Sequence, residues 1–369
     1  MHGLYVHVPF CVSKCSYCDF YSLPGRIEAA GDYVKAIIEE AKTYRGMSFD
    51  TLYIGGGTPS VLGAQHLETL MSGLNRQFDF SAMVEATIEV NPDSATDTFL
   101  QAAKKFGLNR VSVGVQSLSD NELKSVNRVH TAAQAVKVIE LIKAIGFKSV
   151  SADLIIGLPG QSWVSLAKSL KTLTNQGVQH LSVYCMSLEY GTPLAQFPPA
   201  NLPNEDLQAE LYEKTRDYLT EQGFTHYEIS NFALPGFECL HNINYWHGGD
   251  YLGLGPAAAS HLDGKRFKNR NDLDAYLANP IKQTEVDEVL DEMGRLGEEA
   301  MLRLRLLVEG INPSVFSGRY NPEAIVRLID RLNKLTERGL LETDGIRYRL
   351  AKKYVLTSNG IFQAVLESG

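Results

Sequence analysis

Residues 5–18 read YVHVPFCVSKCSYC, an apolar run that leads into three cysteines spaced Cys-x3-Cys-x2-Cys. The apolar part predicts a buried strand over Leu4–Val8, with Cys11, Cys15 and Cys18 just beyond its carboxyl end. Structural zinc sites and ordinary iron–sulfur clusters take four protein ligands. Three neighbouring cysteines leave one metal position open for chemistry, so we interpret them as an iron–sulfur site. A zinc site completed by a distant cysteine is the alternative.

Composition and charge indicate a globular protein with a mildly acidic surface. The chain has 369 residues, of which 44% are hydrophobic and 21% charged, and its formal net charge is -8. Such a charge lacks the positive field on which non-specific nucleic-acid binding relies, so we expect no nucleic-acid partner. No apolar run reaches the roughly 18 residues of a spanning helix, and the N-terminus lacks the pattern of a signal peptide. We therefore expect a cytoplasmic protein whose five cysteines stay reduced.

Short apolar runs alternate with longer amphipathic runs as far as about residue 230. The predicted strands are Leu4–Val8, Thr51–Ile54, Val84–Val90, Arg110–Val115, Lys148–Ile156 and His180–Ser187. The predicted helices between them include Asp32–Arg45, Ala64–Phe78, Thr98–Phe106, Thr131–Ile145 and Ser162–Gln176. This alternation predicts an α/β fold in which residues 1–230 form a parallel sheet, partly closed as an incomplete, TIM-like (β/α)6 barrel.

Polar and glycine residues gather near the carboxyl ends of the predicted strands. Gly55-Gly56-Gly57-Thr58-Pro59 follows the second strand, Glu89 lies near the end of the third, and Gln116 follows the fourth. Asp153 lies in the fifth strand, just before Gly157-Leu158-Pro159-Gly160. The carboxyl ends of barrel strands meet at one face, where barrel enzymes carry their active sites. We therefore expect these residues and the three cysteines to share one site.

The rest of the chain changes character twice. Residues 231–287 are rich in Gly, His, Asn and aromatic residues, show little periodicity, and are predicted to connect two domains. Residues 288–369 carry three helix-period stretches and two short strands around Asp344-Gly345, a hairpin signal. We predict a small, mostly helical, winged-helix-like domain there.

The cysteine motif resembles that of radical S-adenosylmethionine (SAM) enzymes. That superfamily shares Cys-x3-Cys-x-aromatic-Cys, and Tyr17 supplies the aromatic residue. The resemblance implies a [4Fe–4S] cluster held by Cys11, Cys15 and Cys18, whose open iron chelates the methionine part of SAM. It assigns no catalytic role to a protein side chain.

A narrower resemblance, to the oxygen-independent coproporphyrinogen oxidase-like subfamily, covers most of the chain. It rests on the motifs IEVNP, GVQS, VNR and ADLIIGLPGQ, on the glycine-rich element and on a tyrosine six residues before the first cysteine. It implies that SAM is bound by Tyr5, Gly56, Gly57, Thr58, Glu89, Gln116, Arg128 and Asp153. The other interpretation of each residue is a buried salt bridge or a strand-end cap.

Two departures separate the chain from true coproporphyrinogen oxidases, and one motif points elsewhere. Phe20 stands where those enzymes have a further cysteine, and only three residues precede the first predicted strand, where they have an arm. The segment HNINYW, residues 241–246, resembles the His-Asn-x-x-Tyr-Trp motif of the HemW family of heme chaperones. This resemblance implies heme binding with His241 as axial ligand, and Cys239 and His247 are alternatives. The other interpretation is an ordered loop in which His241 is a hydrogen-bonded core residue.

We therefore expect a heme chaperone that binds a [4Fe–4S] cluster, SAM and heme and delivers heme to an apo-protein such as a respiratory enzyme. The alternatives are an oxygen-independent coproporphyrinogen III dehydrogenase, which decarboxylates propionates oxidatively, or another radical SAM enzyme that modifies a tetrapyrrole. Whether SAM is cleaved, and which protein receives heme, are left open by the sequence.

Overall fold

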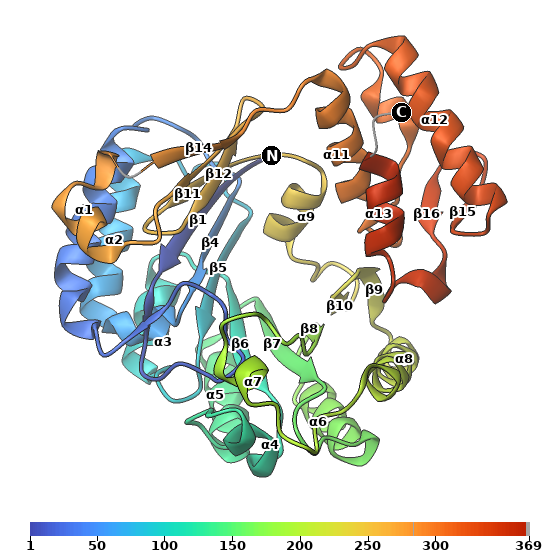
Figure 1. The fold of residues 1–369 in the computed structure, drawn as a ribbon. Helices are drawn as coiled ribbons and strands as arrows, with labels where there is room; N and C mark the ends of the chain where they lie inside the picture. Colours follow the sequence, from blue (N-terminus) through green and yellow to red (C-terminus); the bar gives the residue numbers. More distant parts are fainter. Residues whose placement is uncertain (283, 367–369) are drawn as a thin grey trace.

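A computed structural model describes residues 1–282 and 284–366 and contains one large sheet with a helical C-terminal part beside it (Figure 1). Residues 283 and 367–369, which fall in the second and third predicted segments, lie outside the described residues. Among the described helices, none is long and apolar enough to span a bilayer.

All six predicted strands are confirmed, with ends that differ by two residues at most. They are β1 (His2–Val8), β4 (Thr51–Gly56), β5 (Glu85–Val90), β6 (Arg110–Gln116), β7 (Ser149–Ile156) and β8 (His180–Cys185). They pair side by side in this order, and every pair is parallel. Apolar side chains on them are removed from water, as in Leu4, Val6 and Val8, which have no exposed surface. Burial of this kind contributes roughly 1.5–3 kcal/mol per large side chain.

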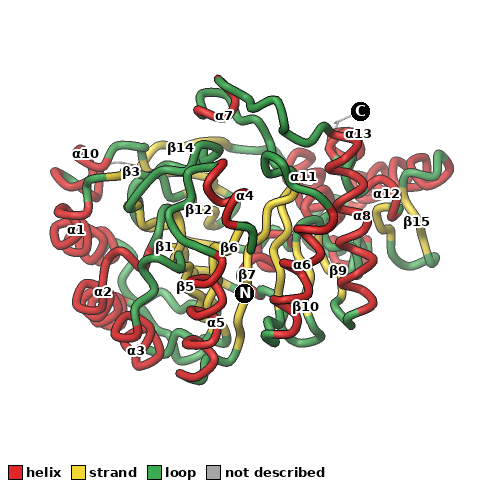
Figure 2. The backbone as a smooth tube through the Cα atoms, turned by 90° about the horizontal axis from the view of Figure 1, so that it is seen from below, coloured by secondary structure: helices red, strands yellow, loops and turns green. Residues whose placement is uncertain are grey.

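The helices cover the outside of the sheet, as expected for right-handed crossovers (Figure 2). The helices of this part are α1 (Ala30–Lys42), α2 (Gly63–Gln77), α3 (Asp97–Lys105), α4 (Asp120–Ser125), α5 (Ala132–Ile145), α6 (Trp163–Asn175), α7 (Pro193–Gln196) and α8 (Glu205–Glu221). The short helix α7 lies apart from the outer layer, where the Leu194 N–H donates to the Ser16 carbonyl at 2.9 Å (Figure 2). Side chains cap several of them. The Asn204 carboxamide oxygen accepts from the Leu207 N–H at 2.9 Å, and Thr131 and Gln134 form a capping box. These caps explain why the helices begin where they do.

Residues 231–287 add strands to the sheet, which the aperiodic sequence did not predict. β11 (Asp250–Leu254) lies parallel to β1, and β12 (Ala259–Leu262), β13 (Lys265–Asn269) and β14 (Thr284–Glu288) continue antiparallel from it. At the other edge β10 (Asn231–Ala233) and β9 (Thr225–Glu228) follow β8. Two helices, α9 (Leu240–Trp246) and α10 (Leu273–Ala278), complete this segment. A separate small pair, β2 (Phe10–Cys11) with β3 (Leu23–Pro24), lies after β1.

The added strands are fixed to the outer helices through one buried carboxyl group. Glu40 on α1 accepts hydrogen bonds from the Tyr276 hydroxyl at 2.5 Å, the Asn269 amide at 2.6 Å and the Gly255 N–H at 2.9 Å. Burial raises the pKa of Glu40, and these three donors oppose that effect. The contact ties α10 and β13 to a helix more than 200 residues earlier in the chain.

The C-terminal part follows the predicted order of helices and hairpin. It contains α11 (Glu292–Leu304), α12 (Pro322–Glu337), the hairpin β15 (Leu341–Thr343) and β16 (Tyr348–Leu350), and α13 (Asn359–Leu366). Asp344 accepts from the Ile346 and Arg347 N–H groups, and Gly345 takes φ 85, which makes the tight turn. The division at residues 230 and 287 into three segments stays a prediction.

Candidate functional site

A cavity of about 370 Å³ lies at the carboxyl ends of the parallel strands. Its wall includes all three cysteines of the motif. It also includes the predicted cofactor residues Tyr17, Gly56, Gly57, Thr58, Glu89, Gln116, Arg128 and Asp153. This is the face that barrels use for catalysis, so the topology brings together residues spread over more than 140 positions.

The cysteines lie on the loop that follows β1 and are free thiols. Cys11 Sγ is 3.5 Å from the Thr58 hydroxyl, and Cys15 Sγ accepts from the Arg128 guanidinium at 3.5 Å. Burial raises the pKa of Cys11 and of Cys18. Among the described residues, no group of three His, Cys, Asp or Glu converges closely enough to hold a single ion. A four-iron cluster takes each thiolate on a different iron atom, so it does not require the three thiolates to converge on one ion.

The glycine-rich element packs directly against the cysteine loop. A Cβ on Gly57 would lie 2.6 Å from the Phe10 carbonyl oxygen and 3.1 Å from Cys11 Sγ. The Gly57 N–H donates to the Val8 carbonyl at 2.7 Å. Glycine is therefore required here by the close approach of two backbones.

Two carboxyl groups face the cavity from β5 and β7. Glu89 accepts from the Tyr53 hydroxyl at 2.7 Å and from the Gly56 N–H at 3.1 Å. Burial, reinforced by the nearby Asp153 carboxylate, raises the pKa of Glu89 to about 7 despite these donors. Asp153 accepts from the Ser112 hydroxyl at 3.1 Å, and burial raises its pKa as well. A ligand that supplies further hydrogen-bond donors or positive charge would stabilise the ionised form of both carboxyl groups.

A cation and a strained backbone complete the wall. The Arg128 guanidinium donates to the Asn91 side-chain oxygen at 2.9 Å and to the Gly114 carbonyl at 2.7 Å. Gln116 has φ 62, an uncommon conformation for a residue other than glycine that often marks functional sites. Two carboxylates and a guanidinium together suit a ligand with amino, carboxylate and hydroxyl groups.

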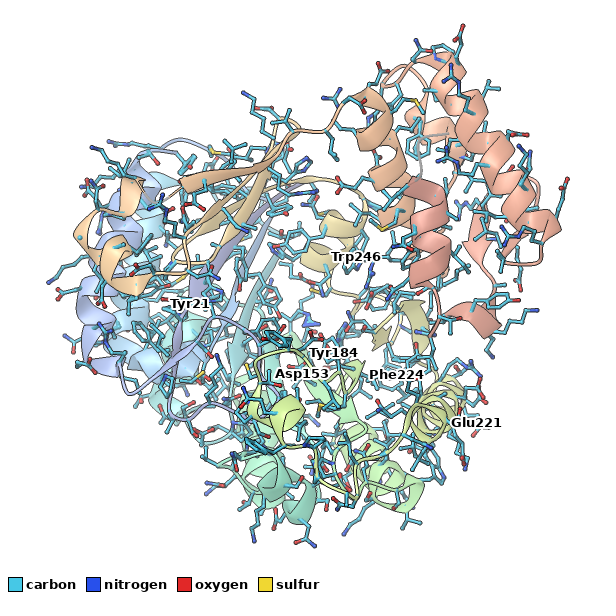
Figure 3. The ribbon with its side chains drawn as sticks, viewed as in Figure 1. Tyr21, Asp153, Tyr184, Glu221, Phe224 and Trp246 are labelled. Atoms are coloured by element: carbon cyan, nitrogen blue, oxygen red, sulfur yellow. The ribbon has the colours of Figure 1, made fainter. Side chains whose placement is uncertain are left out.

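Some predicted residues lie elsewhere and some lining residues were missed. Tyr5 is not among the described residues that line this cavity; its hydroxyl bonds to His7 Nδ1 at 2.9 Å. Sequence reasoning missed the cavity residues at the end of β8 and just after it, including Tyr184, which Figure 3 places beside Asp153. Cys185, the last residue of β8, is exposed and lines the cavity as well. Its position at the carboxyl end of the sixth strand was the signal that could have identified these residues.

His241 lies outside this cavity, on α9, with 1% of its surface exposed. Its Nδ1 bonds to the Thr51 hydroxyl at 2.8 Å and its Nε2 to the Tyr245 hydroxyl at 2.8 Å. Burial lowers the pKa of His241 to about 3, so the ring is neutral. Of the two alternatives, Cys239 is also buried, and His247 Nε2 bonds to Glu309 at 2.9 Å. The role of His241 as a heme ligand stays a prediction.

Comparisons with known proteins identify the family. Residues 5–173 match the family model of the radical SAM superfamily. The chain is 34% identical to "Heme chaperone HemW" of Lactococcus lactis, over 99% of this chain and 97% of that protein, and 33% identical to that of Bacillus subtilis, over 99% of both. Its fold matches Escherichia coli coproporphyrinogen III oxidase (HemN) with a TM-score of 0.85 at 24% identity, over 99% of this chain and 89% of that one. The chain belongs to the HemW family within the radical SAM superfamily.

Proposed function

We propose that this protein is a heme chaperone that carries a [4Fe–4S] cluster and SAM, binds heme and delivers it to an apo-protein. Membership of the superfamily implies the cluster and SAM. The observation that carries the proposal is the convergence of three cysteines, two buried carboxyl groups and a guanidinium on one cavity at the barrel face. The relatives that match the chain over its whole length are named heme chaperones, which supports the choice of cargo.

In this proposal Cys11, Cys15 and Cys18 hold the cluster, and the rest of the cavity wall holds SAM. Backbone groups at Gly56 and Gly57 and the Glu89 carboxylate receive the polar groups of SAM. The Arg128 guanidinium, which already reaches Cys15, offsets the negative charge of cluster thiolates. When bound, such a cluster supplies the electron that cleaves the sulfonium bond of SAM.

The alternative is an enzyme that decarboxylates coproporphyrinogen. The likeness to coproporphyrinogen III oxidase, at 24% identity, shows a shared fold, and one fold hosts several functions. Phe20, which occupies the position of the oxidases' further cysteine, is 64% exposed near the mouth of the cavity. That position therefore offers an apolar ring and no thiol to a substrate.

One anaerobic experiment separates the two functions. The chain is reconstituted with iron and sulfide, and cluster formation is followed by visible absorption and by electron paramagnetic resonance after reduction. The Cys11→Ala, Cys15→Ala and Cys18→Ala variants are expected to lose the cluster signals and SAM binding, whereas Cys185→Ala, the matched control, keeps the cluster. Incubation with coproporphyrinogen III, SAM and a reductant is expected to yield no protoporphyrinogen.

Heme transfer is tested in the same preparation. The heme-loaded chain is mixed with an apo-cytochrome of a respiratory enzyme, and the appearance of the acceptor's heme spectrum is measured. Transfer faster than from free heme supports a chaperone. Stoichiometric formation of protoporphyrinogen, or transfer no faster than from free heme, would overturn the proposal.

A further inference from the structure

A second cavity, of about 530 Å³, lies beside α9 on the side of the C-terminal helices. Its walls come from α9, from β11 to β13, and from α11 with the segment that precedes α12. Figure 3 shows Trp246 extending from α9 toward the C-terminal helices. The volume lies within the roughly 300–1,000 Å³ range of small-molecule sites.

The wall on the α9 side is aromatic. The ring centroids of Tyr245 and Tyr251 are 4.5 Å apart at an interplanar angle of 69°, and Trp246 lies next to them. The Arg305 guanidinium stacks 4.3 Å from the Trp246 ring. The indole N–H of Trp246 is buried and has no acceptor among the described residues. The flat aromatic surfaces on this side suit the face of a planar ligand such as a porphyrin, while seven of the sixteen residues that line the cavity are charged.

His261 on β12 lines this cavity with one ring nitrogen available. Its Nδ1 is 3.3 Å from the Gly249 carbonyl oxygen and 4.0 Å from the Asp250 carboxylate. In the part of the chain that the structure describes, Nε2 has no hydrogen-bond partner, and 19% of the side chain is exposed. Metal-ligating histidines usually donate one ring N–H to a carbonyl or carboxylate, which leaves the lone pair of the other nitrogen free. His261 has this arrangement before any metal is bound.

The three axial-ligand candidates that the sequence suggested do not have a free ring nitrogen or thiolate at this cavity. His241 uses both ring nitrogens in hydrogen bonds of 2.8 Å inside the protein. The Nε2 of His247 bonds to Glu309, and His247 is not among the residues that line this cavity. The Cys239 thiol is 1% exposed, donates to Glu85, and has a pKa raised by burial to about 12. A thiol that stays protonated is a poor ligand for heme iron.

The wall carries three guanidinium groups and four carboxylates, two of which belong to Asp250 and Asp263. Glu298 forms a bidentate pair with Arg266, at 2.8 Å for both contacts, and the buried Glu299 accepts from Arg319 at 2.8 and 2.9 Å. Arg295 lines the cavity and has no ion-pair partner among residues 1–282 and 284–366. A free guanidinium at the edge of the cavity can bind a carboxylate in bidentate fashion.

We propose that this cavity binds heme, with His261 Nε2 as axial ligand to the iron and Arg295 at a propionate. The assignment rests on the proposed function, because it takes heme as the cargo. In it, Tyr251 and Trp246 face the ring, and α9 supplies the wall, while His241 holds the helix in place.

The test is a heme titration of the full chain followed by Soret absorption and magnetic circular dichroism. His261→Ala is expected to weaken heme binding at least about tenfold and to remove the signature of histidine ligation, which added imidazole restores. Arg295→Gln is expected to weaken binding about threefold without changing the ligation signature. His66→Ala is the control, since His66 lies on α2 with its Nδ1 bonded to the Leu62 carbonyl.

A ligand exchange guards against variants that misfold. His261→Tyr should replace the histidine signature of ferric heme by that of a bound phenolate, a gain of signal that unfolding cannot produce. Heme bound equally well and with an unchanged spectrum by wild type, His261→Ala and His261→Tyr overturns this assignment while heme binding itself stands. Loss of the histidine signature in His241→Ala, with His261→Ala unaffected, also overturns it. A wild-type chain that binds no heme overturns both the assignment and the proposed function.

Discussion

The affinity of the barrel-face cavity for SAM should depend on the protonation of Glu89. In the empty cavity burial raises the pKa of this carboxyl group to about 7. SAM brings positive charge and hydroxyl and amino donors, which favour the ionised carboxylate. Binding then requires loss of the proton, so affinity should fall as pH falls below about 7.

The size of the effect follows from the ionised fraction. With a pKa of about 7, Glu89 is ionised in roughly one molecule in eleven at about pH 6 and in ten of eleven at about pH 8. The dissociation constant should therefore be about tenfold larger at the lower pH, which corresponds to about 1.4 kcal/mol.

The same shift predicts how the stability of the empty protein changes with pH. The pKa of Glu89 in the folded state lies above its usual value of 4.5, so the folded state binds more protons than the unfolded state between about pH 4.5 and 7. The free energy of unfolding should therefore fall as pH rises through this window, by up to about 3 kcal/mol. Because a ligand that favours the ionised carboxylate offsets this loss, SAM should stabilise the protein more at higher pH.

The assay is anaerobic calorimetric titration of reconstituted protein with SAM across this pH range, for wild type and for Glu89→Gln. The glutamine keeps the shape of the side chain and does not titrate, so the variant should bind more weakly at about pH 8 and show a much flatter pH profile. Titration of SAM and of the cluster contributes equally to both proteins. Parallel pH profiles for wild type and Glu89→Gln would refute the reasoning.

Three further substitutions test contacts at the barrel-face cavity and the contact that fixes the added strands to α1. Gly57→Ala should lower the yield of reconstituted cluster, measured by visible absorption, because the added Cβ would overlap the Phe10 carbonyl oxygen. Gly360→Ala is the control: its Cβ would meet nothing within 4 Å, so the yield should not change. Tyr53→Phe removes a hydrogen bond that lowers the pKa of Glu89, so the midpoint of SAM affinity should move to higher pH, and an unchanged midpoint would contradict the assignment. Glu40→Ala leaves three buried donors unpaired and should reduce the free energy of urea unfolding by about 3 kcal/mol or more, whereas a loss below about 1 kcal/mol would show that water replaces the carboxylate.

The parallel strands were predictable because each is a local run of apolar residues buried on both faces. The segment Ser149–Ile156, for example, has seven buried residues of eight, Ser149 and Ser151 among them, and residues 154–156 are an unbroken apolar run. Its one charged residue, Asp153, is the residue that is not fully buried, and it faces the cavity. A charge within a buried strand was thus itself the signal for a site.

The strands after residue 231 were not predictable by the same logic. Residues 250–254 read DYLGL, which is short and carries a glycine, and their partner β1 lies almost 250 residues away. Pairing to β1 buries Leu252 and Leu254 completely. This segment forms a strand because it pairs with the edge of β1. That is a tertiary contact, which the local pattern of hydrophobic residues does not predict.

The site was predicted where a motif marks it and missed where none does. The cysteines and the strand-end residues lie together as expected because the carboxyl ends of parallel strands share one face. The same cavity is lined, without a recognisable motif, by Tyr184 and Cys185 at the end of β8 and by Met186, Ser187 and Glu189 after it. Tyr5 was assigned by resemblance alone, and its place in β1 directs its hydroxyl to His7.

The His-Asn-x-x-Tyr-Trp motif has a physical explanation that does not require its histidine to bind iron. Its first residues fix α9 to the sheet. The His241 ring packs directly on β1, since a Cβ on Gly3 would lie 3.0 Å from it. The buried Asn244 amide donates to the Asp250 carbonyl at 3.0 Å. Its last residues, Tyr245 and Trp246, lie one turn further on and line the larger cavity. A helix of seven residues is too short to hold an orientation by itself, so the aromatic wall depends on that anchor. The spacing of the motif links the residues that anchor α9, His241 and Asn244, to the aromatic residues of the cavity wall, Tyr245 and Trp246. The motif would therefore accompany heme binding even if the iron ligand is His261 on β12.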